Sequence, residues 1–384
     1  MDLFDKAKHL LDENVLGKQD TSALGIDIGS SAIKLVQLKN DKGNAVLETY
    51  GEIALGPFAE TEVGQATNLS PEVLAEALKE LVKESNVTTT TCGASIPFSS
   101  SLIKLIDVPP LEPSKLAAVI PIEARKYIPV PIQEVQLDYF VIPETEQKLF
   151  QGARTSEEAA ATVLKSRMVL IVAMHNEVLR RYTQTLQLAE LTPEFFEIEV
   201  FSNIRSTIAR SLAPVAIIDL GAATSKLYLV ELGIVLSSHV VSTGSQDITR
   251  SLATSTHVSV AKAEEIKRQA GILSGVSNED AARVSHAATL TMEQIFAEAR
   301  RVLIGFQQKY NKVITKVILT GGGASLRGLK DFAKQQLELE VEIANPFSHV
   351  QAPAFLEDVL KEAGPDFSTA VGLALRKLHE SDSQ

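Results

Sequence analysis

Residues 25–35 read GIDIGSSAIKL, and residues 217–227 read IIDLGAATSKL. Both stretches follow the pattern Ile-Asp-x-Gly-small-small-x-x-Lys-Leu, and five of its ten positions are identical in the two copies. In each copy an apolar run precedes the glycine and a second apolar run follows it, which predicts two strands joined by a tight turn. A pattern of this length that occurs twice indicates a duplicated domain.

The residues around the first copy predict a run of strands and one helix. Residues 23–38 predict a β-hairpin, and residues 45–55 predict a third strand. Residues 71–84 predict a helix, because Pro71 suits its first turn and Ser70 is a suitable cap. A further strand follows this helix.

The second copy opens a similar region. From residue 214 the sequence again predicts three antiparallel strands, and a helical stretch follows at 245–311. The residues after it predict a strand, a triple-glycine turn and further helix. We therefore expect a mixed α/β protein of two similar domains whose Asp-x-Gly turns face one cleft.

Residues 94–192, between the two repeats, have a different composition that is punctuated by proline. They predict a small inserted α+β subdomain, in which the polar stretch 143–166 forms a mobile surface loop. The expected division of the chain is an amphipathic lead-in helix (1–20), a first domain (21–93), the inserted subdomain (94–192), a return to the first domain (193–213), a second domain (214–244 and 312–384, with a closing helix that can recross to the first) and a helical subdomain of the second domain (245–311).

Composition limits the classes of function. A chain of 384 residues is too long for one ordinary core. The formal net charge of -11, without a cluster of Lys and Arg, argues against nucleic acid as the main partner. The single cysteine, Cys92, forms no intramolecular disulfide, fits a reducing compartment and belongs to a predicted strand. No apolar run approaches the ~20 residues that span a bilayer, and no secretory signal is present, so we expect a cytoplasmic protein.

The two Asp-x-Gly turns suit the binding of a phosphate group. Glycine lets the backbone approach a ligand closely, and amides freed by such a turn form a nest for phosphate oxygens. A carboxylate such as Asp27 or Asp219 repels phosphate unless a cation lies between them, and Mg²⁺ held through water is the natural choice. Lys34, on the strand that leaves the first turn, adds a point charge.

The third glycine-rich turn, at Gly321-Gly322-Gly323, is not a Walker loop, because no Gly-Lys-Ser/Thr follows it. A strand–Gly-Gly-Gly–helix turn of this kind lays bare backbone against a flat adenine and ribose. The three turns together predict a nucleotide clasped between two halves.

In this order, the three turns resemble the phosphate-1, phosphate-2 and adenosine motifs of the actin-like ATPase superfamily, which includes actin, the Hsp70 chaperones, sugar kinases and the division protein FtsA. The strings LGIDIGSSAIKLVQL, FFEIEVFSNIRS, AIIDLGAATSKLYLV and ILTGGGASLRGL resemble more closely the PilM-like proteins of type IV pilus assembly. The string EARKYIPVPIQEVQLDY, at 123–139, is the most specific, because it belongs to the small subdomain that PilM-like and FtsA-like proteins share.

The resemblance implies an actin-like (duplicated RNase H-like) fold that binds ATP and Mg²⁺ between its halves. It assigns Asp27 and Asp219 to the metal, through water. The implied nucleotide-binding residues are Asp27, Gly29, Ser30, Ser31 and Lys34 at phosphate-1; Asp219, Gly221, Ala222, Ala223 and Thr224 at phosphate-2; Gly321, Gly322 and Gly323 at the adenosine turn; and Glu265 with Lys267 or Arg268 on the helix that edges the adenine.

Hydrolysis is harder to assign from sequence. Glu197 and Glu199 lie where the chain recrosses between the halves, and they are the candidates to orient an attacking water. Phosphoryl transfer depends on positioning and charge stabilisation, so a protein can keep the nucleotide site yet turn over slowly. We therefore interpret ATP first as a structural and regulatory ligand.

The resemblance also implies partners. PilM-like proteins sit at the inner face of the cytoplasmic membrane and capture the cytoplasmic N-terminal tail of PilN, a single-span membrane protein. They do so in a groove between the first domain and the inserted subdomain, where main-chain hydrogen bonds and side-chain pockets combine. Other components of the pilus platform, including its assembly ATPase, and self-association belong to the same expectation.

Two alternative functions compete with the pilus adaptor. An FtsA-like filament former is tethered to the membrane by a C-terminal amphipathic helix, whereas this sequence closes with the polar string ALRKLHESDSQ. A metabolic kinase of the same superfamily would need a sugar pocket with an Asp base, and the inserted subdomain is of the wrong type for that. The pilus adaptor is the favoured interpretation.

Overall fold

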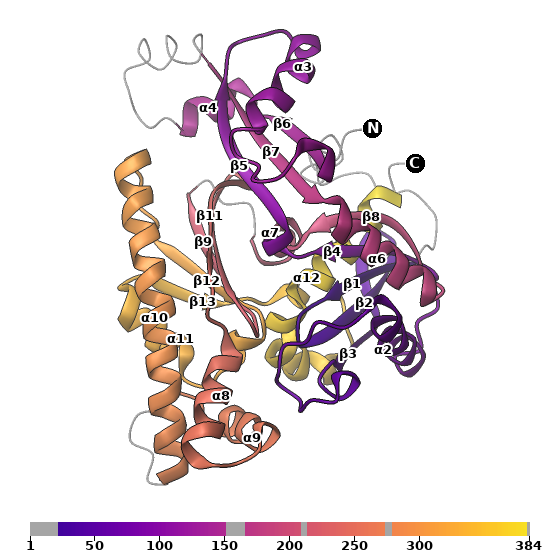
Figure 1. Ribbon diagram of the computed structural model, residues 1–384, viewed down its shortest axis with the longest axis vertical. Coiled ribbons are helices and arrows are strands. Elements are labelled where there is room, and N and C mark those ends of the chain that lie inside the picture. The colour runs from indigo at the N-terminus through magenta and orange to yellow at the C-terminus, as the bar shows by residue number, and fades with distance from the viewer. Residues whose placement is uncertain (1–21, 151–165, 209–212, 273–278, 382–384) are drawn as a thin grey trace.

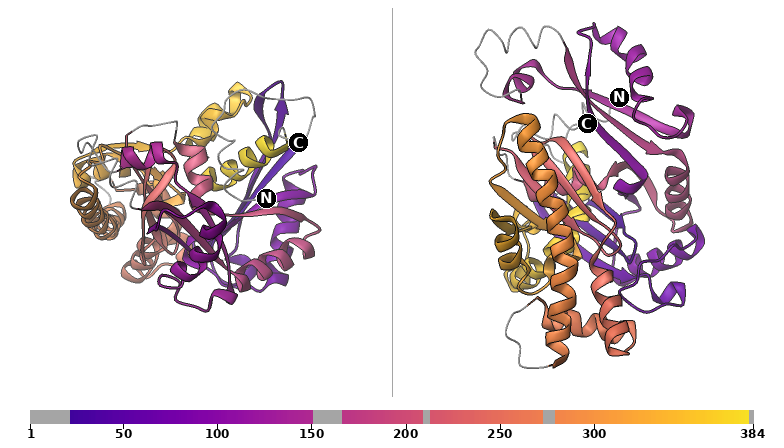
Figure 2. Two further views of the ribbon diagram at one scale, coloured as in Figure 1. Left: turned by 90° about the horizontal axis from the view of Figure 1, so that it is seen from above. Right: turned by 60° about the vertical axis from the view of Figure 1, so that its left-hand side comes forward.

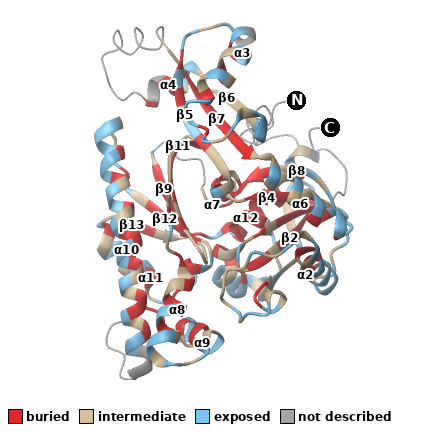
Figure 3. Ribbon diagram, in the orientation of Figure 1, coloured by how far each residue is buried: buried red, intermediate tan, exposed pale blue. Residues whose placement is uncertain are grey.

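The computed structural model describes residues 22–150, 166–208, 213–272 and 279–381, and Figure 1 shows their arrangement. The lead-in helix expected at residues 1–20 lies outside the described residues. Among the described residues the strands form two five-stranded sheets and one three-stranded sheet. Figure 3 shows that buried residues concentrate along these strands and on the helix faces that cover them.

The two large sheets have the same topology. The first has the order β3-β2-β1-β4-β8 and the second the order β11-β10-β9-β12-β13. In both, the first three strands pair antiparallel and the last two add in parallel, so the predicted duplication of an α/β unit is confirmed. The strands are β1 (Ser22–Ile28), β2 (Ala32–Asp41), β3 (Asn44–Ala54), β4 (Thr91–Ile96) and β8 (Thr192–Ile198) in the first sheet, and β9 (Val215–Leu220), β10 (Ser225–Glu231), β11 (Ile234–Val241), β12 (Lys316–Thr320) and β13 (Glu340–Ile343) in the second.

The hairpin that opens each sheet repeats in atomic detail. Asp27 lies opposite Lys34 across β1 and β2, and Asp219 lies opposite Lys226 across β9 and β10. At the first turn, Gly29 N–H donates to the Ala32 carbonyl at 3.0 Å. A Cβ on Gly29 would lie 2.9 Å from that same oxygen, so the tight turn requires a glycine there.

Helices from distant parts of the chain cover the first sheet. The predicted helix at 71–84 is confirmed as α2 (Pro71–Glu84), and the Ser70 hydroxyl caps it by accepting from Val73 N–H at 3.5 Å. Helix α6 (Asn176–Leu188) packs against α2, and the closing helix α12 (Glu357–Ser381) packs against β1, β2 and β4. The C-terminal helix therefore lies on the first sheet, beside α7 (Glu199–Thr207).

The helices of the second half lie on the other side of the molecule. They are α8 (Ser245–Thr256), α9 (Val260–Ala270), α10 (Glu279–Tyr310) and α11 (Leu329–Leu337). In Figure 1 the long α10, in orange, runs along one whole side, and α8 and α9 lie at its lower end. In the described part of the helical stretch expected at 245–311, the chain forms three helices, α8, α9 and α10.

The insert forms a separate layer at one end of the molecule in Figures 1 and 2. Its sheet has the order β5-β7-β6, from β5 (Ser101–Val108), β6 (Val135–Val141) and β7 (Arg167–His175). Helix α3 (Pro113–Ala124) buries Leu116 and Ile120 against this sheet, in a small core of its own. The end of β4 and all of α6 lie with the first sheet, so the insert's own sheet spans a narrower range than the expected 94–192.

The prediction of a surface loop at 143–166 is wrong for residues 144–150. Residues 144–150 form helix α4 (Glu144–Phe150), and Gln147 and Phe150 in it are 1% and 2% exposed. The Phe150 ring joins the main core and lies 5.6 Å from the Lys312 ammonium of the second half. One aromatic side chain therefore anchors a stretch whose average composition is polar. Residues 151–165 lie outside the described residues.

We expect Phe150→Ala to lower the free energy of unfolding by about 3–5 kcal/mol, because it removes a fully buried ring and leaves a cavity. Urea denaturation followed by circular dichroism measures the change. The exposed Glu144 on the same helix is the matched control, and Glu144→Ala should change stability by less than about 0.5 kcal/mol. Equal effects of the two substitutions would show that α4 does not anchor the insert.

Candidate functional site

The third turn lies against the carboxylates of two other elements. Gly321 has a φ of 80°, and a Cβ there would overlap the Asp219 carboxylate. A Cβ on Gly322 would lie 2.5 Å from Asp366 Oδ1, at the side of α12. Only glycine therefore fits sterically at this turn. The turn lies beside the end of the strand that carries Asp219.

At the first turn, the Asp27 carboxylate is half-buried and only lightly engaged. Asp27 Oδ1 accepts from the Ser95 hydroxyl at 2.6 Å. Lys34 points elsewhere, with its ammonium 2.7 Å from Asp366 Oδ1 and 3.8 Å from Glu52 Oε1. Burial raises the pKa of Asp27, and the neighbouring Asp219 adds to this effect. An added cation would therefore stabilise the ionised form of this carboxylate in the first half.

At the second turn, the corresponding lysine already has carboxylate partners. Lys226 Nζ lies 2.8 Å from Glu199 Oε2 and 3.3 Å from Asp219 Oδ2, in a buried position. The other oxygen of Glu199, Oε1, accepts from Phe98 N–H at 2.7 Å. Burial raises the pKa of Glu199, while Lys226 opposes that shift. The duplication is therefore asymmetric: the two equivalent lysines bind different partners.

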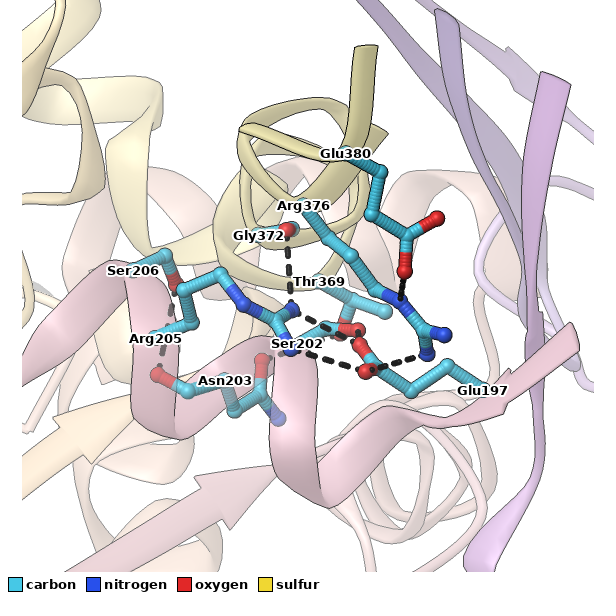
Figure 4. A network of polar contacts seen from close by, with 9 residues as sticks. All are labelled: Glu197, Ser202, Asn203, Arg205, Ser206, Thr369, Gly372, Arg376 and Glu380. Atoms are coloured by element: carbon cyan, nitrogen blue, oxygen red, sulfur yellow. Dashed lines mark hydrogen bonds and ion pairs between the residues drawn. The ribbon is translucent and has the colours of Figure 1, made fainter. Parts of the chain in front are cut away.

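Of the two glutamates that the sequence offered for hydrolysis, the structure brings only Glu199 to the turns. Figure 4 shows Glu197 held between two guanidinium groups, with Arg205 and Arg376 each 2.8 Å from a carboxylate oxygen. The Ser202 hydroxyl donates to it as well. Burial alone would raise the pKa of Glu197, but the two arginines hold it at about 2. Glu197 therefore ties β8, α7 and α12 together.

On α9 the structure turns a different glutamate inward from the one the sequence proposed. Glu265 is exposed and pairs with Lys262 at 2.7 Å. Its neighbour Glu264 is buried, accepts from Thr249 Oγ1 at 2.7 Å and lies 2.7 Å from the Lys267 ammonium. Arg268, largely exposed, also reaches Glu264 at 2.9 Å. The helical periodicity of the buried Ala263, Glu264 and Lys267 was the signal available in the sequence.

A loop of the first half reaches across to the second half beside the first turn, which the sequence did not indicate. Ala66 N–H donates to Gln246 Oε1 on α8 at 3.0 Å, and Glu62 Oε2 accepts from Ala261 N–H on α9 at 2.5 Å. Thr67 N–H donates to the Ser30 carbonyl at 2.8 Å. The first turn and the α8–α9 helices are thus linked through a single loop.

The remaining turn residues have small side chains that leave the backbone accessible. Ser30 is exposed, and Ser31, Ala222, Ala223 and Thr224 are half-buried. At the second turn, Gly221 N–H donates to the Thr224 carbonyl at 3.1 Å, which matches the first turn. The geometry suits a phosphate chain that lies between the two turns.

The carboxylate side chains at the turns do not form a metal site by themselves. The described residues hold no cluster of three or more His, Cys, Asp or Glu side chains that could bind a metal ion. Asp27 and Asp219 remain, and Asp219 already shares the Lys226 ammonium. Magnesium in nucleotide sites needs only one or two carboxylates, because phosphates and water complete its shell. The residues therefore fit a metal that arrives with a nucleotide.

Two sheets of identical topology, with glycine turns facing one another, define the actin-like class of proteins. Solved structures of that class are similar to this chain. The MamK double helical filament has a TM-score of 0.50 at 13% identity, with 92% of this chain and 97% of that chain covered. The ethanolamine utilization protein EutJ from Carboxydothermus hydrogenoformans has a TM-score of 0.52 at 13% identity, with 96% and 94% covered. These two show the fold.

A family model described as type IV pilus assembly protein PilM matches residues 25–378, and the chain belongs to that family. A solved PilM–PilN type IV pilus biogenesis complex is similar to it, with a TM-score of 0.76 at 26% identity, over 94% of this chain and 99% of that chain. Among the described residues no helix combines the length and the apolar character needed to cross a membrane.

We expect Glu197→Gln to destabilise the protein by about 3–5 kcal/mol at neutral pH, because two buried guanidinium groups lose their counter-charge. The folded pKa of Glu197, about 2, lies below its ordinary value of 4.5. Its contribution is therefore complete above about pH 4.5 and disappears as the pH falls toward 2.

Urea unfolding of the parent and of Glu197→Gln across this pH range tests both statements. The loss of stability on acidification should be smaller in the variant. Glu194→Gln is the control, because Glu194 is half-exposed and its pair with Lys377 should contribute less than about 1 kcal/mol. A variant as acid-sensitive as the parent would contradict this account.

Proposed function

We propose that this protein is an ATP-binding, actin-like adaptor of the type IV pilus assembly platform. In this proposal it works in the cytoplasm at the inner face of the membrane and binds the cytoplasmic N-terminal segment of a PilN-type membrane protein. The observation that carries the proposal is the likeness to a PilM–PilN complex along 94% of the chain, within the PilM family.

In the proposed nucleotide site, the first and second turns hold the phosphates, and Gly321–Gly323 lie against the adenosine. Asp27 would orient the water shell of Mg²⁺, because among the described residues its carboxylate accepts only from the Ser95 hydroxyl and has no lysine within ion-pair distance. Bound Mg²⁺ would supply charge neutralisation of the phosphates. On α9, Glu264 and Lys267 would face the nucleoside part of the bound nucleotide, and Glu265 would not.

Slow turnover is part of the proposal. Glu199 is the candidate to orient a water molecule, but Lys226 and Phe98 N–H already engage both of its oxygens. A carboxylate held in this way is a weak base for water. We therefore assign ATP a structural and regulatory role.

The proposed peptide site is a hollow of about 400 Å³ between the insert and the first half. We call it the α6 hollow. One edge of α6 and Gln136 of strand β6 line it, and four of the seven lining side chains are carboxamides. These groups can hydrogen-bond the backbone of an extended peptide, a mode in which main-chain contacts supply affinity. The lining residues are Gln136, Asn176, Leu179, Arg180, Thr183, Gln184 and Gln187.

For the nucleotide, we expect Asp27→Asn to weaken Mg·ATP binding at least tenfold, because the metal loses a carboxylate that holds its water shell. Since burial raises the pKa of Asp27, affinity in the parent should fall as the pH is lowered toward that pKa, and binding should release protons. Isothermal titration calorimetry in two buffers measures both effects. The exposed Asp41 provides the control variant, Asp41→Asn. Parent-like binding by Asp27→Asn would remove Asp27 from the site.

For the peptide, we expect Arg180→Glu and Gln187→Trp each to weaken binding of a labelled PilN-type N-terminal peptide at least tenfold. The first reverses a charge at the rim of the α6 hollow and the second fills it. Fluorescence anisotropy gives the affinities. Arg125→Glu makes the same charge change on the exposed end of α3, outside the hollow, and should bind as the parent does. Unchanged affinity in both hollow variants would place the peptide elsewhere.

A further inference from the structure

The long helix α10 carries apolar side chains on the face that points away from the rest of the molecule. Leu290 and Ile304 are 55% and 56% exposed, and Ala297, midway between them, is exposed as well. The opposite face of the same helix supplies core residues such as Met292 and Phe296. In the right-hand view of Figure 2, α10 lies in front of the sheets, and Figure 3 shows its outer side as exposed. The exposed apolar face is therefore additional to the face that the fold uses.

The three exposed residues form a stripe. Leu290, Ala297 and Ile304 follow one another at intervals of seven residues, which is close to two helical turns, so they lie in one row. The row is roughly 21 Å long at 1.5 Å per residue. Single exposed apolar residues need no explanation. A row at heptad spacing is different, because it is the pattern by which one helix packs against another.

Gly305, beside this stripe, is a second sign that another helix packs here. It is exposed in the interior of α10, and no atom of the described residues lies within 4 Å of the position that a Cβ on it would take. Glycine weakens a helix interior relative to alanine. Nothing in the described part of the chain requires a glycine at this position. Close approach of a second backbone next to Ile304 would require one.

We propose that the exposed face of α10 binds the same face of a second copy of this chain, with the two helices antiparallel. A twofold interface is self-complementary, because a residue that contacts a second residue in the partner is also contacted by it. Leu290 and Ile304 each lie seven residues from Ala297. With the twofold axis beside Ala297, each Leu290 meets Ile304 of the second copy, and the small Ala297 side chains let the helices approach at the centre.

The charged residues along the stripe fit the same arrangement. Glu293 and Arg301 are exposed and each lie four residues from Ala297, so each Glu293 meets Arg301 of the second copy. A parallel pair of helices would instead bring like charges together. Arg301 already pairs with Glu298 on its own helix at 2.5 Å, but an exposed pair of this kind contributes little and leaves the guanidinium able to bind a second carboxylate.

The overall charge of the chain also favours this face. Copies with a net charge of -11 repel one another in general. On the outer side of α10, the exposed Arg300, Arg301 and Lys309 outnumber the acidic Glu293 and Glu298, so the repulsion is smallest there. The inference needs neither the nucleotide nor the peptide. It therefore goes beyond the proposed function, and its test does not depend on that function.

The test measures self-association of the full chain by sedimentation velocity, without ligands. We expect a reversible dimer in the micromolar range, since a contact made by one helix is small. Ile304→Glu should weaken the dimer at least tenfold, because it places a carboxylate in the apolar contact. Ile122→Glu is the matched control: Ile122 is 61% exposed on α3, away from α10, and this variant should dimerise as the parent does.

Charge reversal tests the antiparallel register. Glu293→Arg and Arg301→Glu should each weaken the dimer at least threefold, because each brings like charges together. The double variant, with both reversals, should return to within twofold of the parent. Circular dichroism checks that each variant is folded, and Arg301→Glu carries the test if Ile304→Glu is not.

A cysteine at the axis gives an independent measurement. Ala297→Cys should form a covalent dimer on mild oxidation, because the two introduced thiols face each other across the axis. Gln307→Cys, exposed on another side of α10, should not. The natural Cys92 is fully buried and does not compete.

Three results would overturn the proposal. The first is a parent that stays monomeric, which would leave the α10 face to a different partner. The second is a dimer that Ile304→Glu does not weaken, because the copies would then meet through another surface. The third is a double charge reversal that associates no better than the two single variants, which would exclude the antiparallel register.

Discussion

The junction of the two halves depends on the ion pairs that the Lys226 ammonium makes. Asp27, Asp219 and Glu199 come together there in largely buried positions, and three carboxylates so close would repel one another. Lys226 lies within 3.3 Å of two of them and supplies the missing counter-charge. A buried charge without a partner destabilises a protein by several kcal/mol. The same lysine lies beside the second turn, which is part of the proposed phosphate site.

A second buried ionic network joins the middle of the chain to helix α12. Glu197 binds Arg205 of α7 and Arg376 of α12, so a strand from the middle of the chain holds the C-terminal helix on the first sheet. Glu197 and Glu199 are two residues apart, yet they face different partners because a strand ends and a helix begins between them. One glutamate stabilises the first half, and the other faces the second half and the insert.

These features agree better with the proposed adaptor than with an efficient ATPase. The carboxylate best placed to orient water is occupied by Lys226 and by the backbone of Phe98. The insert contacts both halves: Phe98 N–H donates to Glu199 of the first half, the Phe98 ring lies against Tyr228 of the second half, and Phe150 lies near Lys312.

The sequence by itself determined the duplicated α/β fold, the hairpins, the turns and the insertion, because these depend on local periodicity and on glycines that a tight turn requires. It also predicted that the Asp27 and Asp219 turns belong together. Only the tertiary structure decided which of two equivalent lysines binds which acid, that Glu264 rather than Glu265 faces inward, and that Phe150 anchors a polar stretch. Those outcomes depend on side chains from segments far apart in the chain, such as Lys34 with Asp366, and a linear pattern carries no record of which segments become neighbours. The partner of a charged group is chosen by burial and distance, which exist only after the chain has folded.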